Sequence, residues 1–564
     1  MYLPKDTFWI TDCGNKFIQV QALARADDWD FRVPYPAREL DPELRFFPFS
    51  GHHFLRVDGD VVSFYPPYFP LLSVVPYRLF GTAGIYLLPL LSSWFCLIAV
   101  SRLSGKQGDV RLLAVLVLGL CTPLFFYSLT FWEHTTAMAL AAWGLCLFLE
   151  THRPERETVA WLAGGLLVGF ATVLREEGYL FLMSVLVGHW AARRTLRPAV
   201  FFLAGWLLTM MPLWVLQESI FGHFLGLHAV AYTTGLAGDG VWAVVSFCRE
   251  KLTNLWVYLF AVSHLLWVNL PLAVPFLTAL AAGVLIRPPV MTSAIARWAM
   301  VASCVSGLAV LAELALHPEP VYETLHSQAL LLPMPFLVFW LLSQRSLLTS
   351  AEDHRKFMSV AASVYVVLAC VMLNRRDMGI IWGARHFLQA LPFMVPLAIH
   401  GFRVVLDGQP SARWKTATVA SGIVLLIASA GIQVHGIRIL HLKKQGSQRI
   451  LERVRSMQTD VIATDVFWLT EEMASLYFEK QIVSINAVSL PLLVDRLRQH
   501  GTAAFCFVTS PIYGRPPGAS LARLLARADR VETVHTPGLD FMRLRLYRIP
   551  LGNSAGGEAL LPDR

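Results

Sequence analysis

The residues of this chain with the clearest chemical potential are isolated acids, histidines and arginines that stand in very apolar surroundings. The first is Asp12, in "TDCGNKFIQVQALARA", which is followed by Lys16. A carboxylate close to a membrane surface can act as a general base toward a hydroxyl group. Aspartate also commonly caps the N-terminus of a helix, and a helix is predicted directly after it. The sequence leaves both roles of Asp12 open.

Two further groups stand at the ends of predicted helices. Glu133 and His134 lie at the mouth of two apolar segments, and Arg175, Glu176 and Glu177 lie at the mouth of the next two. Ionisable groups at such depth usually face a cavity or one another. They either line a substrate pocket or, for Arg175 and Glu176, pair with neighbours to close a helical hairpin.

A third group begins a late apolar span in "NRRDMGIIWGARHFLQALPF". Arg385 and His386 follow the small residues Gly383 and Ala384. A guanidinium group can bind a phosphate through two parallel hydrogen bonds, so we expect Arg385 to bind phosphate. The alternative role of Arg385 is to anchor the span at the membrane interface beside Trp382.

Histidines and carboxylates also surround one predicted loop, at His317, Glu319, Glu323 and His326. These residue types could hold a divalent metal ion. Their spacing matches no known ligand pattern, so a solvated loop is favoured, and neither a metal site nor a cofactor is predicted.

The elements that must position these residues are membrane helices. Only 15% of the 564 residues are charged and the mean hydropathy is +0.53, whereas a soluble domain has about 25% charged residues. We therefore predict an all-α polytopic bundle of about twelve transmembrane helices. The approximate spans are 83–102, 112–131, 134–150, 159–174, 178–192, 199–217, 264–286, 298–316, 327–343, 357–373, 387–405 and 416–435.

The loops between these spans differ in charge. Sixteen Lys and Arg residues, among them Lys106, Arg355 and Arg403, lie in one set of loops, and six, among them Arg175 and Arg385, lie in the other. The positive-inside rule assigns the first set to the cytoplasm. The net charge of +8 is thus explained by topology and does not indicate nucleic-acid binding. The acids, histidines and arginines described above gather on the opposite side.

Four regions are predicted along the chain. Residues 1–80 form a first external loop with an amphipathic helix at 11–26, and because such a loop needs a preceding helix, we expect one further span upstream. Residues 81–436 form the bundle, in which 241–260 is an interfacial helix. Residues 437–550 form a small external α/β domain with strands at "DVIATD", "KQIVSIN" and "AAFCFVTS". Residues 551–564 are predicted to be a disordered tail.

Together, these motifs resemble the C-type glycosyltransferase superfamily, which includes protein O-mannosyltransferases, the aminoarabinose transferase of lipid A and bacterial proteins of the glycosyltransferase 39 or RgtA-like kind. Asp12 in "TDCGNKF" is similar to the catalytic Asp of the first external loop of that family. The segments "SFYPPYFPLL", "LREEGYLFL" and "WGARHFLQALPF" are similar to its loop exit, its Arg/Glu hairpin and its Gly-x-Arg-aromatic segment. Where an acid is common after the Asp, this chain has Cys13.

The resemblance implies a bacterial inner-membrane glycosyltransferase that is active on the extracytoplasmic face. It would transfer a sugar from a polyprenyl-phosphate donor to a lipid, glycan or protein acceptor, with inversion. Asp12 would be the catalytic base, and the donor phosphate would be bound by Arg175, Arg385, Lys16 and Arg38. The remaining members of the pocket would be Glu133, His134, Glu176, Glu177 and His386. The alternative function is that of a transporter or lipid flippase. Transporters bind their substrates near the middle of the membrane, whereas the ionisable residues here gather at helix ends, which argues against this alternative.

Overall fold

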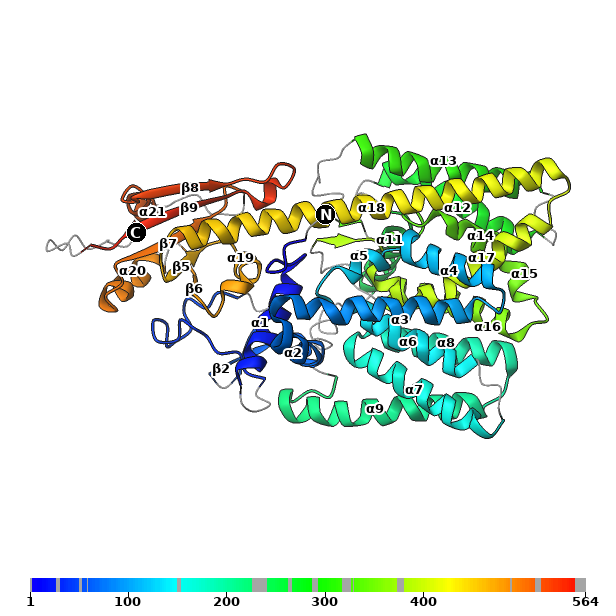
Figure 1. Cartoon of the computed structure of the whole chain (residues 1–564), viewed down its shortest axis with the longest axis horizontal. Coiled ribbons are helices and arrows are strands. Elements are labelled where there is room, and N and C mark those ends of the chain that lie inside the picture. The colour runs from blue at the N-terminus through cyan, green and yellow to red at the C-terminus, as the bar shows by residue number, and fades with distance from the viewer. Residues whose placement is uncertain are drawn as a thin grey trace. The chain divides into compact units, whose positions relative to one another are not determined.

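The chain divides into two compact units, which are described separately (Figure 1). One unit contains Met1–Ile85 and Ile439–Arg564, and the other contains Tyr86–Pro318 and Glu323–Arg438. The structure is a computed structural model. It describes residues 3–26, 31–49, 53–57, 59–149, 154–225, 241–261, 266–286, 293–316, 326–327, 329–372, 380–486, 489–512 and 519–552.

Helices make up almost all of the second unit. Among the described residues, seven helical segments are long and apolar enough to cross a membrane: Tyr68–Leu103, Glu157–Leu174, Arg197–Ser219, Ala294–Leu316, Asp353–Met372, Arg385–Asp407 and Ala412–Ser456. The helices of this unit, with the one that leaves it, are α3 Leu87–Leu103, α4 Gly108–Cys121, α5 Leu124–Ser128, α6 His134–Leu149, α7 Glu157–Leu174, α8 Glu177–Arg193, α9 Arg197–Phe221, α11 Val241–Phe260, α12 Leu266–Leu285, α13 Ala294–Leu316, α14 Val338–Leu342, α15 Gln344–Leu348, α16 Asp353–Met372, α17 Leu391–Asp407 and α18 Ala412–Ser456. The polytopic helical class is confirmed, with seven helices rather than about twelve meeting both criteria.

Two of the predicted spans are not continuous helices. The segment 112–131 breaks at Thr122, between α4 and α5, because Pro123 offers no backbone N–H to the preceding turn. The segment 327–343 contains a turn, the 3₁₀ helix η5 (Pro335–Leu337) and the single helical turn α14. Apolar composition alone does not show such breaks.

Glycines let the helices around α7 approach each other closely. A Cβ atom on Gly165 of α7 would collide with the backbone of Phe202, and one on Gly205 of α9 would collide with the backbone of Leu162. Small residues at helix contacts are the usual means of tight packing inside a membrane. α7 and α9 therefore lie side by side (Figure 1), which fixes the position of Arg175 at the end of α7.

The N-terminal part of the first unit is more ordered than a loop. Helix α1 (Thr11–Arg25) confirms the predicted helix, and Cys13–Leu23 are all buried. A hairpin that the sequence did not predict follows, with strands β1 (Phe54–Val57) and β2 (Asp60–Ser63) in antiparallel pairing. The end of the predicted external loop forms helix α2 (Tyr68–Phe80), and the 3₁₀ helix η1 (Gly81–Tyr86) follows it.

The C-terminal part of the first unit contains a five-stranded mixed sheet of order β6-β5-β7-β9-β8. The predicted strands are confirmed as β5 Val461–Thr464, β6 Gln481–Ser484 and β7 Ala504–Thr509, and they are mutually parallel. The sequence did not predict β8 (Arg530–Val534) or β9 (Leu544–Pro550), whose pairing is antiparallel. The remaining elements are α19 Leu469–Glu472, η7 Ala474–Leu476, α20 Leu490–Gln499, α21 Ala519–Leu525 and η8 Asp540–Met542.

The N-terminal and C-terminal segments share one core. The ammonium group of Lys443, in the part of α18 that belongs to this unit, lies 2.7 Å from Glu472 Oε2 and donates to the carbonyl oxygen of Phe8. Thr470 donates to the carbonyl oxygen of Pro48, and Tyr477 to that of Pro34. Residues that the sequence assigns to an external loop and to a separate domain therefore pack against each other.

Candidate functional site

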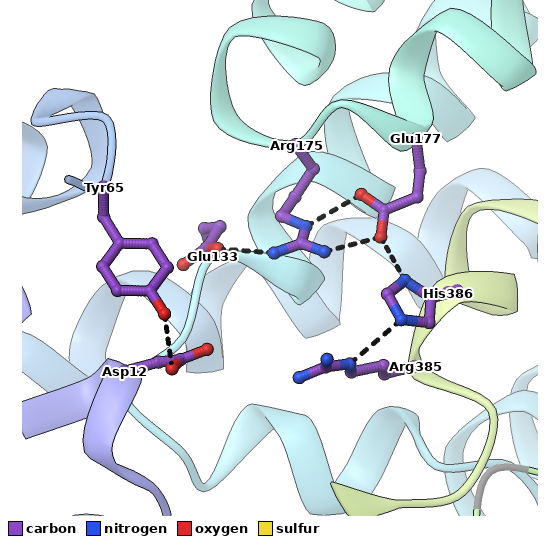
Figure 2. A network of polar contacts seen from close by, with 7 residues as sticks. All are labelled: Asp12, Tyr65, Glu133, Arg175, Glu177, Arg385 and His386. Carbon is purple, nitrogen blue, oxygen red and sulfur yellow. Dashed lines mark hydrogen bonds and ion pairs between the residues drawn. The ribbon is translucent and has the colours of Figure 1, made fainter. Parts of the chain in front are cut away.

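The bundle carries a buried ionic cluster centred on Arg175 (Figure 2). Arg175 Nε and Nη2 donate to the two carboxylate oxygens of Glu177 at 2.9 and 2.5 Å, and Nη1 donates to Glu133 Oε1 at 3.1 Å. Glu133 and Glu177 are 3% and 4% exposed. Buried charges persist only when they are paired and hydrogen-bonded, and the two carboxylates meet this condition through one guanidinium group.

His386 links this cluster to the second arginine (Figure 2). Its Nδ1 lies 2.6 Å from Glu177 Oε1, and its Nε2 accepts a hydrogen bond of 3.2 Å from Arg385 Nε. A neutral imidazole with the proton on Nδ1 satisfies both contacts. The Arg385 guanidinium lies over the ring of Trp132, 5.2 Å from its centroid.

Local backbone geometry places these side chains. A Cβ atom on Gly178 would collide with Thr172, so glycine allows the tight turn from α7 into α8 that carries Arg175 and Glu177. Gly383 has φ +63° and lies against Pro123, where a side chain would not fit. Strand β4 (Ile381–Trp382) comes directly before Gly383 and pairs with β3 (His326–Ser327). The 3₁₀ helix η6 (Arg385–Ala390) follows Gly383 after one residue.

Two tyrosines hold the backbone of this segment. Tyr365 OH donates to the carbonyl oxygen of His386, and Tyr127 OH donates to that of Trp382, both at 2.8 Å. Trp382 is 3% exposed and its indole donates to Gln433, so it lies inside the protein and does not form an interfacial anchor with Arg385. The phosphate-binding alternative for Arg385 therefore remains a prediction, with Trp132 as its aromatic neighbour.

The predicted pocket residues separate into two groups. Glu133, Glu177 and His386 join the Arg175 cluster, and the ring of His134 lies next to Trp132, with centroids 4.7 Å apart. Glu176 is exposed. Arg175 does pair with neighbours, Glu133 and Glu177, and Glu177 reaches it because it is on the inward face of the first turn of α8.

Asp12 belongs to a second polar cluster, in the other unit (Figure 2). Its Oδ1 accepts a hydrogen bond of 2.8 Å from the Tyr65 hydroxyl group. Asp12 is the second residue of α1, whose N-cap is Ile10, so the helix-capping role is wrong. Lys16, one turn later, is 3% exposed, and its ammonium lies 4.8 Å from the centroid of the Tyr65 ring.

A neutral hydrogen-bond network fixes the hairpin on α1. Asn15 Nδ2 donates to the carbonyl oxygen of His53 at 2.9 Å, and Gln19 Nε2 donates to Ser63 Oγ at 2.6 Å. Ser63 Oγ in turn donates to Asn15 Oδ1 and accepts from the backbone N–H of Tyr65. Because Asn15, Gln19 and Ser63 are all buried, this network holds Tyr65 in place to bind Asp12.

The same cluster contains a histidine–carboxylate pair that the sequence did not single out. His53 Nδ1 lies 2.5 Å from Glu471 Oε1, and the rings of His53 and Tyr65 are stacked with centroids 6.2 Å apart. Burial opposes the protonation of His53, but the carboxylates of Glu471 and Asp12 outweigh burial and raise the pKa of His53 above its usual value of 6.5.

This shift predicts a pH-dependent stability. A pKa that is higher in the folded state contributes stability below the unfolded pKa of about 6.5, and the contribution is lost as pH rises through the folded pKa. We expect the midpoint of thermal unfolding of the purified protein to fall over that range. In His53→Gln this part of the pH dependence should disappear, since other titrating groups are common to both proteins. An identical profile in both proteins would contradict the role of His53.

The remaining predicted residues lie outside these clusters. Arg38 is exposed in the turn 36–40. His317, Glu319 and Glu323 lie outside the described residues, as does the side chain of His326. Sequence reasoning also missed four residues of the clusters: Tyr65, Trp132, His53 and Glu471. Tyr65 and Trp132 could have been found, because they are polar aromatic residues next to predicted site segments. Nothing in the local sequence marks His53 or Glu471.

Comparison with known proteins identifies the fold. No family model matches the chain, and no curated protein matches it significantly. Two crystal structures of ArnT from Cupriavidus metallidurans, one bound to undecaprenyl phosphate and one apo, match with 12% identity and a TM-score of 0.52, over 98% of this chain and 96% and 95% of theirs. The apo oligosaccharyltransferase of Archaeoglobus fulgidus matches 89% of this chain and 66% of its own, with 12% identity and a TM-score of 0.49. The chain therefore has the fold of ArnT, which confirms the fold expected from the resemblance to the C-type glycosyltransferases.

Proposed function

We propose that this protein is a membrane glycosyltransferase that moves a sugar from a polyprenyl-phosphate donor to an acceptor hydroxyl group. The main support is a fold shared along almost the whole chain with ArnT, which binds undecaprenyl phosphate. Onto this fold the chain places an oriented carboxylate in one unit and a buried arginine cluster in the other. These are the two groups that such a transfer requires.

Asp12 is the proposed general base. As the acceptor oxygen attacks the anomeric carbon, its proton passes to the carboxylate, and the bond between that carbon and the phosphate oxygen breaks on the opposite face. The configuration of the sugar is therefore inverted. Tyr65 donates to Oδ1 and fixes the direction of the carboxylate, and the ammonium of Lys16 lies over the ring of Tyr65.

Arg385 is the proposed partner of the leaving phosphate. Developing charge on polyprenyl phosphate is stabilised best by a cation that is held in place before the reaction. Arg385 is held by the Trp132 ring and by His386, which Glu177 orients. Three N–H groups of Arg175 already bind two carboxylates, so we assign Arg175 a positioning role in place of the direct phosphate contact expected from the sequence.

The remaining features follow from the chemistry of the donor and from the charge pattern. Because nucleotide sugars are cytoplasmic, a transferase of the outer face needs a donor carried across the membrane on a lipid. We propose a bacterial inner membrane and an extracytoplasmic site, the side with six cations against sixteen. The acceptor is a lipid, a glycan or a protein. Arg38 is not retained as a phosphate ligand, since it is exposed.

The fate of the sugar–phosphate bond tests the function against transport. Vesicles that contain the purified protein, together with extracted envelope acceptors, are supplied with polyprenyl phosphates that carry labelled hexoses or pentoses. We expect label in an acceptor and an equal amount of free polyprenyl phosphate. A transporter or flippase would move the donor and leave this bond intact, so movement without cleavage would overturn the proposal.

Arg385→Lys is expected to lower kcat/KM for the donor about ten- to hundredfold, because lysine keeps the charge but loses the paired hydrogen bonds. The measurement is the initial rate of polyprenyl phosphate release at several donor concentrations. Arg249→Lys is the matched control, since Arg249 is exposed on α11 and lies on the same predicted side. Equal rates for Arg385→Lys and wild type would remove Arg385 from the phosphate site.

A further inference from the structure

A cavity lies in the bundle, away from the Arg175 cluster. It has a volume of about 370 Å³ and is formed by the end of α3, the loop that leads into α4, the start of α16 and the part of α17 from Pro396 to Arg403. Arg385 precedes α17, and Arg403 of the cavity lies 12 residues after Leu391, the first residue of α17, which is about 18 Å along the helix axis. The cavity is therefore distinct from the proposed phosphate site.

The polar part of the cavity is positive. Lys106, Arg355 and Arg403 line it together with one carboxylate, that of Glu352, which lies 3.0 Å from Arg355 Nε. Arg403 is in turn paired with Asp109, whose carboxylate lies 3.0 Å from Arg403 Nη2, so three cations against two acids leave an excess of one positive charge, with His354 and His400 counted as neutral. All three cations are in the set of loops that the charge rule assigns to the cytoplasm.

The loop wall of the cavity is fixed in the structure. Arg403 Nη1 donates to Gln107 Oε1, and Arg403 Nη2 donates to Asp109 Oδ2 at 3.0 Å. These bonds hold the loop between α3 and α4 against α17. The positive groups thus come from one fixed loop and two helices, α16 and α17, around a defined space, unlike a set of independent surface charges.

The other part of the cavity is apolar. Met358, Leu397 and Ile399 line it and are buried, and they belong to helices long and apolar enough to cross a membrane. A cationic rim above an apolar floor at a helix end fits an amphiphile with a negative head. Basic pockets between membrane helices on the cytoplasmic side are suited to anionic phospholipids, whose headgroup phosphate meets Lys and Arg there.

We propose that this cavity binds the phosphate headgroup of an anionic phospholipid, with the first part of an acyl chain on Met358, Leu397 and Ile399. Lys106 and Arg355 contact the phosphate, and Arg403 shapes the wall and adds its charge. The site does not depend on the proposed sugar transfer, because it uses none of the residues assigned to that reaction.

The test measures lipid binding to the purified full chain in a neutral detergent. Short-chain phosphatidylglycerol is titrated in and its dissociation constant is obtained by native mass spectrometry. Phosphatidylcholine and inorganic phosphate are titrated in parallel. We expect phosphatidylglycerol to bind at least tenfold more tightly than either. Equal binding of phosphatidylcholine would overturn the proposal, and inorganic phosphate that binds as tightly would identify a free-phosphate site instead.

Variants place the lipid in this cavity. Lys106→Gln is expected to weaken phosphatidylglycerol binding about fivefold, and Lys106→Gln with Arg355→Gln about 25-fold, since each basic residue near the surface contributes about 1 kcal/mol. Arg413→Gln is the matched control, because Arg413 is an exposed cation of the same predicted side that does not line the cavity. If the double variant does not fold, the single variant Lys106→Gln still tests the site, because Lys106 is exposed and its replacement should not affect folding. Unchanged binding in Lys106→Gln would overturn the site.

Discussion

Replacing Asp12 by Asn is expected to lower the rate of sugar transfer by about 10²- to 10⁴-fold, the usual contribution of a positioned general base. Asparagine has nearly the same shape and still accepts the hydrogen bond from Tyr65 OH, so the fold of α1 and its hairpin should be retained. The loss then reports the missing proton acceptor. The measurement is the rate of polyprenyl phosphate release under saturating donor, where kcat rather than KM is expected to fall.

Two further variants make the result specific to Asp12. Tyr65→Phe removes the hydrogen bond to Oδ1 but leaves the base, and it should cost about tenfold. Asp60→Asn removes an exposed carboxylate of the same unit, which pairs with Arg32, and should have no effect. Wild-type turnover in Asp12→Asn would remove Asp12 from the reaction.

A combination of Asp12→Asn with Arg385→Lys asks whether both residues serve one transfer reaction. Residues that act together on one transition state are strongly non-additive. We therefore expect the double variant to lose less than the product of the two single losses. Fully multiplicative losses would indicate that the two residues contribute independently, with no coupling between them.

Replacing Lys443 by Met is expected to lower the free energy of unfolding by about 3–5 kcal/mol, because it leaves the carboxylate of Glu472 buried without its cation. The side chains of Lys443 and Glu472 are only 1% and 5% exposed, and the ammonium also binds the carbonyl oxygen of Phe8. The pair therefore connects α18, α19 and the N-terminal segment. Unfolding of the purified protein by heat and denaturant measures the loss.

The double variant Lys443→Met with Glu472→Leu separates the charge effect from packing. Removing both charges replaces a buried ion pair by apolar contacts, which is often close to neutral, so most of the stability should return. Lys415→Met is the control on the same helix, where Lys415 is exposed. A stable Lys443→Met protein, or a double variant as unstable as the single one, would contradict a buried pair that holds the unit together.

The sequence predicted those helices and strands whose own residues show a clear hydrophobic pattern. The apolar face of 11–26 predicted α1, and the buried runs in "DVIATD" and "AAFCFVTS" predicted β5 and β7. The breaks at Thr122 and before η5 were missed, because composition averages over a window, whereas a helix ends at a single backbone position. Strand β9 had a weak alternating pattern in "LRLYRIP", and its antiparallel partner β8 had none.

The class of protein and the residue types of its chemistry follow from composition and local pattern alone. Its low charge content required a membrane bundle, and an acid or arginine in an apolar helix end must be paired or functional, since burial of a lone charge is too costly. Which of these groups contact each other is visible only in the folded chain. There Glu177 pairs with Arg175, Tyr65 binds Asp12, and His53 binds Glu471 across more than four hundred residues. Such contacts depend on close packing, of the kind that Gly178 and Gly383 permit, and local sequence patterns carry no information about which distant segments will pack together.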